Sequence, residues 1–171
     1  MLTASLFQRK DVCRKLKIRV LPRAFFEKVK GAPTEVELLE KSKIISINSS
    51  WGFDDTPPFS PELLNHPHLL TLTFDDICNE PETPEDLGNA VLFNEAMAQQ
   101  IMRFVDDGKL PLLVHCTAGI SRSGAVGEVL NWYFNRYLKR NAQDDEDFTQ
   151  NNRQIQPNSI VRRIMLKVLQ K

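Results

Sequence analysis

One short stretch of the sequence holds residues whose types and spacing suit chemistry on an anion: HCTAGISRSG, from His115 to Gly124. A nearly continuous apolar run, LPLLV, precedes it, and a stretch with apolar residues at helical spacing follows it. Cys116 is therefore predicted at the end of a buried strand and Arg122 at the start of a helix. Because a helix N-terminus offers free N–H groups and a positive dipole end, the stretch predicts a local anion site.

The loop between the cysteine and the arginine consists mainly of small residues, so it can curl until successive amides face one phosphate-sized oxyanion. We expect these amides from Thr117, Ala118, Gly119, Ile120 and Ser121. Arg122 would add a planar fork that matches two of the oxygens of this anion, and all these groups favour the thiolate form of Cys116. The stretch thus predicts a cysteine that attacks phosphorus and forms a cysteinyl-phosphate, without a metal or cofactor. The alternative interpretation is a turn beside a buried, inert cysteine.

These residues also resemble a known family. HCTAGISRS resembles the H-C-x-x-G-x-x-R-[ST] signature of cysteine-based protein tyrosine phosphatases, and AGISRS is similar to their dual-specificity branch. The resemblance implies that Cys116 is the nucleophile, Arg122 the phosphate clamp and His115 a residue that orients the loop. It implies that Ser123 hydrogen-bonds the sulfur and helps it leave. It further implies a phosphorylated protein or peptide as substrate and binding of phosphate, sulfate or vanadate in the loop.

Such an enzyme also needs an acid to protonate the leaving oxygen. LTLTFDDICNE offers Asp75 and Asp76 after a predicted strand, and FDD resembles the acid loop of the phosphatases of regenerating liver, where the second Asp is the acid. We predict Asp76, with Asp75 as the alternative. Asp76 lies 40 positions before Cys116, farther than the family usually places it. Asp86, 30 positions before, is the third candidate, although TPEDL is typical of a helix start.

Strands that alternate with helices predict an α/β fold, a single domain over residues 1–171 with a mostly parallel central sheet flanked by helices. Strands are expected at 17–21, 43–48, 68–74 and 110–115. Helices are expected at 23–29, 86–107, 124–137 and 157–171. Residues 1–15 are expected to form a disordered leader, and residues 139–156 a solvated polar insert. The predicted site lies at the carboxyl end of a strand, where ligands of such sheets gather.

Composition excludes several classes of partner. The 22 lysines and arginines balance the 22 acidic residues, so no overall field indicates binding to nucleic acid or to a membrane surface. No segment is long and apolar enough to span a bilayer. Cys13, Cys78 and Cys116 show no paired spacing, and no Cys/His cluster indicates a metal site. We therefore predict a cytoplasmic protein, with no prediction of its oligomeric state.

Three functions compete on these residues: a dual-specificity protein phosphatase, a phosphatase of a non-protein substrate (an RNA 5′ end, an inositol phosphate or a nucleotide), and a phospho-binding module without turnover. Intact Cys116, Arg122 and Ser123 argue against the binding module. Relatives that act on inositol lipids tend to carry lysine at the positions of Thr117 or Ile120, so this resemblance disfavours lipid.

Three further residues have two interpretations each. Trp51 and Phe53 follow a predicted strand and either wall the substrate cleft or pack half-buried. Cys78 is close to the predicted acid loop. It is either unpaired or, as in some relatives, a reversible disulfide partner of Cys116.

Overall fold

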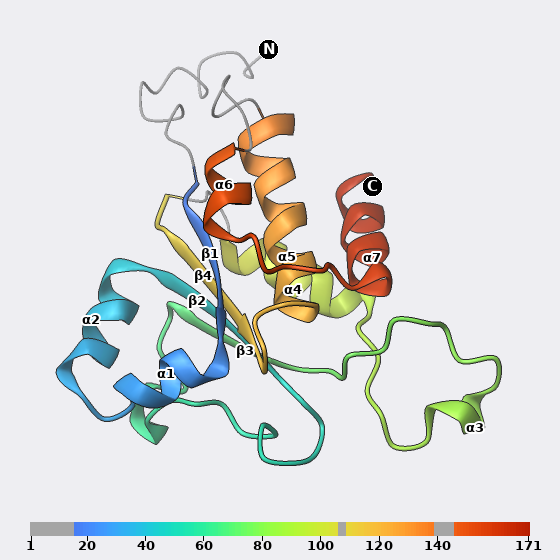
Figure 1. Ribbon diagram of the computed structural model, residues 1–171, viewed down its shortest axis with the longest axis horizontal. Coiled ribbons are helices and arrows are strands. Elements are labelled where there is room, and N and C mark those ends of the chain that lie inside the picture. Colours follow the sequence, from blue (N-terminus) through green and yellow to red (C-terminus); the bar gives the residue numbers. More distant parts are fainter. Residues whose placement is uncertain (1–15, 106–108, 139–145) are drawn as a thin grey trace, which may run out of the picture.

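The sheet of this protein has four parallel strands. The computed structural model describes residues 16–105, 109–138 and 146–171. The strands are β1 (Ile18–Pro22), β2 (Lys43–Asn48), β3 (Leu69–Thr73) and β4 (Leu112–Cys116), in the order β1-β4-β2-β3. Helices flank both faces of the sheet (Figure 1). The predicted fold class, a single-domain α/β protein with a parallel central sheet, is confirmed.

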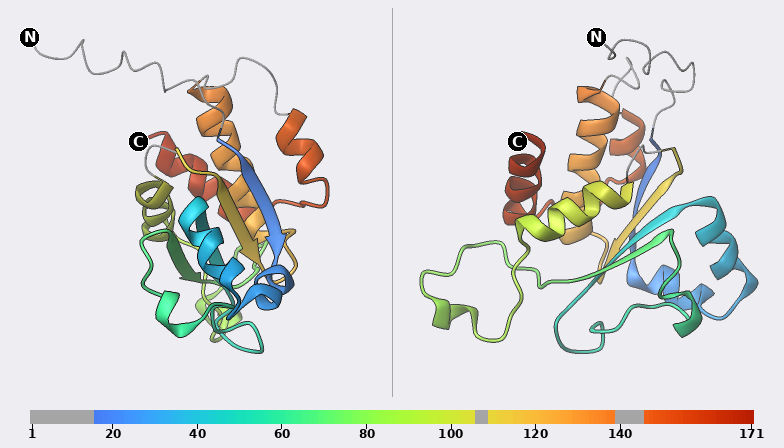
Figure 2. Two further views of the ribbon diagram at one scale, coloured as in Figure 1. Left: turned by 90° about the vertical axis from the view of Figure 1, so that its left-hand side faces the viewer. Right: turned by 180° about the vertical axis from the view of Figure 1, so that it is seen from behind.

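Two helical layers cover the sheet (Figures 1 and 2). One face carries α1 (Arg23–Val29), α2 (Pro33–Lys41) and the short turn η1 (Pro61–Leu63). The other carries α4 (Glu95–Val105), α5 (Arg122–Asn131), its π-helical continuation η2 (Trp132–Tyr137), α6 (Glu146–Asn151) and α7 (Ser159–Leu169). None of the helices among the described residues is long and apolar enough to cross a membrane.

The central strand β4 is buried along its whole length because a core lies on each side of it. Alternate side chains of a strand point to opposite faces. Leu113 packs in the smaller core with Phe26, while Val114 and Cys116 belong to the larger core under α4, α5 and α7. This explains why the strand reads as a continuous apolar run that ends in a buried cysteine.

The prediction of one helix over residues 86–107 is wrong. The short α3 (Pro84–Leu87) and α4 are separate, because Gly88 ends α3 at φ +57°. The chain between these two helices is fixed by contacts to the segment after β3. The N–H of Asp75 donates to the carbonyl of Val91, and the N–H of Val91 donates to the carboxylate of Asp75. Phe93 packs on Phe74, with 4.8 Å between the ring centroids. Helix α2 is an element that the sequence patterns did not predict.

The prediction of a solvated insert at 139–156 is wrong for its second half. Residues 146–151 form α6, and Phe148 is buried in the larger core. The buried Asn152 accepts a hydrogen bond from the N–H of Val20 (2.7 Å) and donates one to the carbonyl of Ile18 (3.2 Å). The Asn152 amide therefore provides hydrogen-bond partners for backbone groups on the free edge of β1, in place of a neighbouring strand. The first half, 139–145, and the predicted leader, 1–15, lie outside the described residues.

Candidate active site

The predicted anion loop runs from the end of β4 to the start of α5. Cys116 is the last residue of β4, and Arg122 is the first of α5. At the apex, Gly119 has φ +70°, and a Cβ there would lie 2.6–2.7 Å from the backbone of β1. A side chain at this position is excluded by both backbone strain and close approach. The glycine therefore lets the loop turn tightly against the neighbouring strand.

The carbonyl groups of this loop point outward. Those of Thr117 and Ile120 accept hydrogen bonds from the backbone N–H groups of Arg23 and Gln156 (3.1 and 3.0 Å). The carbonyl of Gly119 accepts from the side chain of Gln154, and that of Ser121 from the N–H groups of Ala125 and Asn158. In a trans peptide unit the C=O and N–H groups point in opposite directions, and the described residues contain no cis peptide bond. Four N–H groups of the loop therefore face its interior: those of Ala118, Ile120, Ser121 and Arg122.

Cys116 lies at the base of this loop with only 3% of its surface exposed. Its Sγ is 3.0 Å from Oγ of Ser123, which is fully buried in the first turn of α5. A hydroxyl at this distance can donate a hydrogen bond to a thiolate. The structure thus brings together the two residues that the sequence analysis placed at the reacting sulfur.

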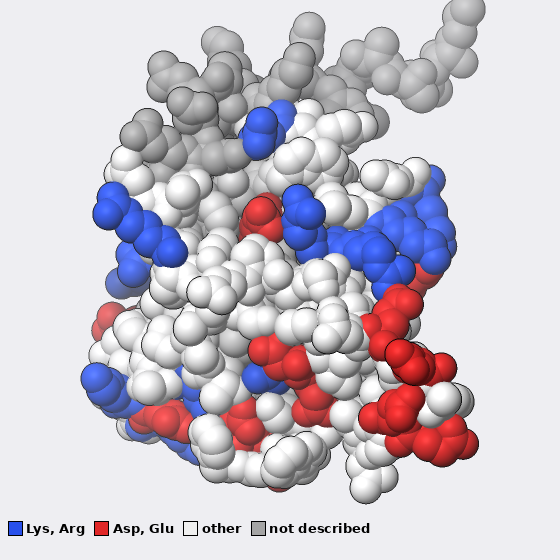
Figure 3. Space-filling model, turned by 45° about the vertical axis from the view of Figure 1, so that its right-hand side comes forward, with Lys and Arg blue, Asp and Glu red and all other residues white. Residues whose placement is uncertain are grey.

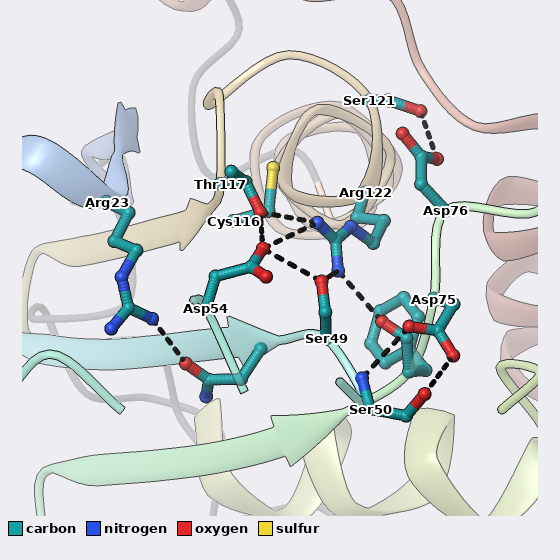
Figure 4. Close-up of polar contacts among 12 residues, drawn as sticks. Arg23, Ser49, Ser50, Asp54, Asp75, Asp76, Cys116, Thr117, Ser121 and Arg122 are labelled. Carbon is teal, nitrogen blue, oxygen red and sulfur yellow. Dashed lines mark hydrogen bonds and ion pairs between the residues drawn. The ribbon is translucent and has the colours of Figure 1, made fainter. Parts of the chain in front are cut away.

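Arg122 is 4% exposed, and its guanidinium is held from one side (Figure 4). Nη1 donates to the carbonyl of Phe74 (2.9 Å) and to Oγ of Ser49 (3.1 Å), and Nη2 donates to Oγ1 of Thr117 (2.8 Å). The buried Nε has no hydrogen-bond partner. A buried charged donor without a partner is costly, so this atom indicates a ligand that the site is built to receive.

Asp54 completes the fixation of the arginine and was not predicted from the sequence. Its carboxylate accepts hydrogen bonds from the hydroxyls of Thr117 and Ser49 and lies 3.9 Å from Nη2 of Arg122. Burial alone would raise the pKa of Asp54, but these hydrogen bonds and the arginine charge outweigh it and lower the pKa below the usual value. Asp54 is therefore a permanent anion that neutralises part of the site. The only sequence signal was an Asp pair soon after a strand.

A second carboxylate anchors the loop that carries Asp54. Glu35 of α2 is buried and accepts hydrogen bonds from the N–H and hydroxyl of Ser60 (2.7 and 2.6 Å) and from the N–H of Gly31 (2.7 Å). Burial would raise the pKa of Glu35, yet these hydrogen bonds lower it. The far end of the loop after β2 is therefore tied to α2, which lies in the same layer as η1.

His115 supports the loop from behind as a neutral side chain. It is fully buried, with Nε2 2.7 Å from Oγ of Ser46 and Nδ1 3.2 Å from the carbonyl of Cys116. Because a carbonyl only accepts, Nδ1 carries the proton and Nε2 accepts from the serine. Burial lowers the pKa of His115 to about 4. The imidazole therefore fixes the carbonyl of the catalytic candidate without adding charge.

The structure separates the three acid candidates. The carboxylate of Asp75 accepts from the N–H and hydroxyl of Ser50 (2.9 and 2.6 Å) and from the N–H of Val91 (2.7 Å). Burial would raise the pKa of Asp75, but these hydrogen bonds lower it. Asp86 forms a capping box with Thr83 at the start of α3, on the segment that projects from the body (Figure 1). Both therefore have structural partners that keep them from the loop.

Asp76, by contrast, is exposed and reaches the anion loop. Its Oδ1 accepts a hydrogen bond from Oγ of Ser121 at 2.7 Å (Figure 4). The same oxygen accepts from Nδ2 of Asn158 at 2.8 Å. Asn158, which the sequence analysis also missed, is the N-cap of α7, and its Oδ1 accepts from the N–H groups of Ile160 and Val161. One buried amide thus caps a helix and holds the carboxylate beside the loop.

Among the described residues, no group of three or more His, Cys, Asp or Glu side chains is placed to hold a metal ion. Cys78 and Cys116 are both free thiols. Cys78 is exposed and lies against the side chain of Asn158, 3.4 Å from its Nδ2. The structure therefore describes the unpaired form of Cys78.

Comparison with known proteins gives one resemblance. No family model and no curated protein matches the sequence. The chain is similar to a solved structure described as the crystal structure of Tk-PTP in the active form, over 93% of this chain and 91% of that chain. The TM-score is 0.45, and 14% of the residues are identical. The function of this chain must therefore follow from the geometry of its own residues.

Proposed function

We propose that this protein is a dual-specificity protein phosphatase, which hydrolyses phosphotyrosine and phosphoserine or phosphothreonine through a cysteinyl-phosphate. One observation carries the proposal: four inward N–H groups and the unpartnered Nε of Arg122 surround the space next to the sulfur of Cys116. These donors match the oxygens of a phosphoryl group and would stabilise the charge they carry in the transition state. The AGISRS resemblance supports the dual-specificity assignment.

In the first step, the thiolate of Cys116 attacks phosphorus in line with the ester oxygen. A P–S bond forms, the P–O ester bond breaks, and its electron pair remains on the leaving oxygen. Asp76, in its protonated form, gives that oxygen a proton, so that a neutral alcohol or phenol departs. Its hydrogen bonds to Ser121 and Asn158 support this role because they hold the carboxyl group at the edge of the loop.

In the second step, water attacks the phosphorus of the cysteinyl-phosphate. The Asp76 carboxylate takes the proton of the water, the P–S bond breaks, and its electron pair returns to sulfur. Ser123, 3.0 Å from Sγ, donates a hydrogen bond to the departing thiolate. Inorganic phosphate is released, and the enzyme is restored.

The experiment that tests this proposal measures the turnover of two classes of substrate, phosphate esters of poor leaving groups and an activated aryl phosphate. The proteins are wild type and the variants Cys116→Ser, Asp76→Asn and Asp75→Asn. We expect Cys116→Ser to abolish turnover of every phosphate ester. Asp76→Asn should slow esters of poor leaving groups by about a hundredfold or more, and an activated aryl phosphate much less, because only a poor leaving group needs the proton. Asp75→Asn is the control because it makes the same change at the neighbouring residue. Its amide oxygen can still accept from the N–H of Ser50, but the donors to the other oxygen lose their acceptor, so the folding of this variant is checked by circular dichroism.

Three results would contradict the proposal in different ways. Turnover by Cys116→Ser at the wild-type rate would exclude the thiol mechanism. A leaving-group dependence that changes in Asp75→Asn and not in Asp76→Asn would assign the acid to Asp75. Vanadate binding by a wild-type protein that hydrolyses no ester would favour the phospho-binding module.

A further inference from the structure

The charges of this chain are segregated along the sequence. Residues 44–102 contain ten acidic residues and no lysine or arginine, although the whole chain is neutral. This segment supplies both loops that frame the anion site: the loop after β2, which carries Asp54, and the loop after β3, which carries Asp76. The rim of the site is therefore built from a uniformly acidic part of the chain.

Some of these acids are paired with basic side chains of the C-terminal segment, and others are not. Glu80 pairs with Arg163, and Glu95 with Lys167 and Lys171. Figure 3 shows the resulting border, where a group of basic side chains meets a group of acidic ones on one face. Lysine and arginine side chains of the described residues form no ion pair with the exposed Asp55 or Asp76.

A second buried arginine, Arg23, lies beside the anion loop but does not offset this negative charge. Arg23, which follows β1, donates from Nε to Glu27 at 2.6 Å and from Nη1 to the side chain of Asn48 at 3.4 Å. Its side chain is only 8% exposed. The positive charge at the site is therefore concentrated on Arg122, inside a negative rim.

Two aromatic side chains stand out from the same rim. Trp51 is 72% exposed and Phe53 is 79% exposed, so the alternative of half-buried packing is wrong. Their loop is fixed at both ends: the N–H of Ser49 binds the carbonyl of Asp54 (3.0 Å), and Ser50 binds Asp75. Exposed aromatic residues on an anchored loop present apolar area at low entropic cost, which is typical of recognition surfaces.

We propose that the substrate is a phosphorylated protein segment with basic side chains beside the phosphoresidue and an apolar residue that packs on Trp51 and Phe53. This inference rests on the proposed phosphatase activity and specifies its substrate. The single phosphoryl group enters the donors around Arg122, while a flanking lysine or arginine faces the exposed Asp55. Asp76 carries its proton when the substrate is bound, so it contributes no charge to this contact. RNA and inositol polyphosphates carry further negative charge beside the reacting phosphate, and the acidic rim would repel it.

The test uses the full chain and matched phosphotyrosine peptides. One peptide has basic flanking residues and a neighbouring leucine, its twin has acidic flanking residues, and a third replaces the leucine by serine. We expect kcat/KM for the basic peptide to exceed that for the acidic twin by about tenfold or more at low salt, and the difference to shrink as salt rises. Replacing the leucine by serine should lower kcat/KM several-fold.

Three variants test which residues cause the preference for the basic, leucine-containing peptide. Asp55→Asn should reduce the preference for the basic peptide about two- to fivefold, the range of an exposed charge pair. Trp51→Ala and Phe53→Ala should each raise KM for the leucine peptide by about fivefold or more. All three should hydrolyse a small aryl phosphate within about twofold of wild type, because none contacts the reacting group. The matched controls are Tyr137→Ala, an exposed aromatic on η2, and Glu40→Gln, an exposed acid on α2.

The outcomes separate this inference from the function on which it rests. Equal kcat/KM for the basic and acidic peptides, with aryl phosphate turnover that depends on Cys116, would overturn the inference and leave the phosphatase proposal standing. Faster turnover of an RNA 5′ end or an inositol polyphosphate than of the basic peptide would also overturn it. Absence of turnover of every substrate would overturn the phosphatase proposal and the inference together.

Discussion

Acidification should destabilise the folded protein through a single buried imidazole. His115 is fully buried, and its two nitrogens bind Ser46 and the carbonyl of Cys116 in the neutral form. A second proton would place a charge in a site that offers no carboxylate partner among the contacts of the ring. The folded state therefore resists protonation that the unfolded chain accepts.

The size of the effect follows from the two pKa values of His115, about 4 when folded and 6.5 when unfolded. Between these values the unfolded chain binds one proton more than the folded chain, so the free energy of unfolding rises with pH. The contribution is complete above pH 6.5 and is lost as the pH falls to about 4. At about 1.4 kcal/mol per unit of pKa, the loss amounts to about 3 kcal/mol.

The assay is urea unfolding of wild type and His115→Gln between about pH 4.5 and pH 7.5. The difference between the two curves isolates the imidazole, because both proteins keep Asp54, Asp75 and Glu35. The lowered pKa values of these carboxyls contribute stability that declines only as the pH falls below their ordinary values of 3.8 and 4.5, and equally in both proteins. Should His115→Gln fail to fold, NMR titration of the wild-type imidazole gives the pKa directly. Parallel curves, or a titration of His115 near 6.5, would refute the reasoning.

Three further predictions concern the geometry of the site. Gly119→Ala should destabilise the protein by about 3 kcal/mol in urea unfolding and abolish vanadate binding, because its Cβ would overlap the backbone of β1. Asn158→Ala and Asn158→Ser should both slow esters of poor leaving groups about tenfold, since each removes the amide donor to Asp76, but only the alanine variant should also lose about 1 kcal/mol of helix-cap stability, because serine is a good N-cap. Asp54→Ala should cost about 3 kcal/mol by leaving the buried charge of Arg122 without its partner, and vanadate should raise the Tm of this variant more than that of wild type.

The anion loop could be predicted from the sequence because its determinants are local. The apolar run of β4, the glycine at the left-handed position and the arginine at the helix start lie within a dozen residues of one another. Each has a direct physical consequence that a short window reveals. The relative placement of Cys116 and Ser123 follows from the strand-to-helix turn alone.

The residues that position this loop could not be predicted in that way. Asp54 reaches Thr117 across 63 positions, and Asn158 reaches Asp76 across 82. No periodicity connects such pairs, because the contacts exist only after the sheet has formed and α7 has docked. The acid assignment had the same difficulty: Asp75 and Asp76 are neighbours, and only the partners supplied by other segments distinguish them.

The outward hydrogen bonds of the anion loop also set an order of events in folding. Three of the loop carbonyls are held by Gln154, Gln156 and Asn158, which follow the loop by more than 30 positions. During synthesis, a chain that has emerged only as far as α5 has the cysteine and the arginine but lacks the groups that turn its amides inward. The loop would therefore turn its amides inward only when the last segment of the chain folds back. The thiol of Cys116 would lack the proposed phosphate-binding groups until folding is nearly complete.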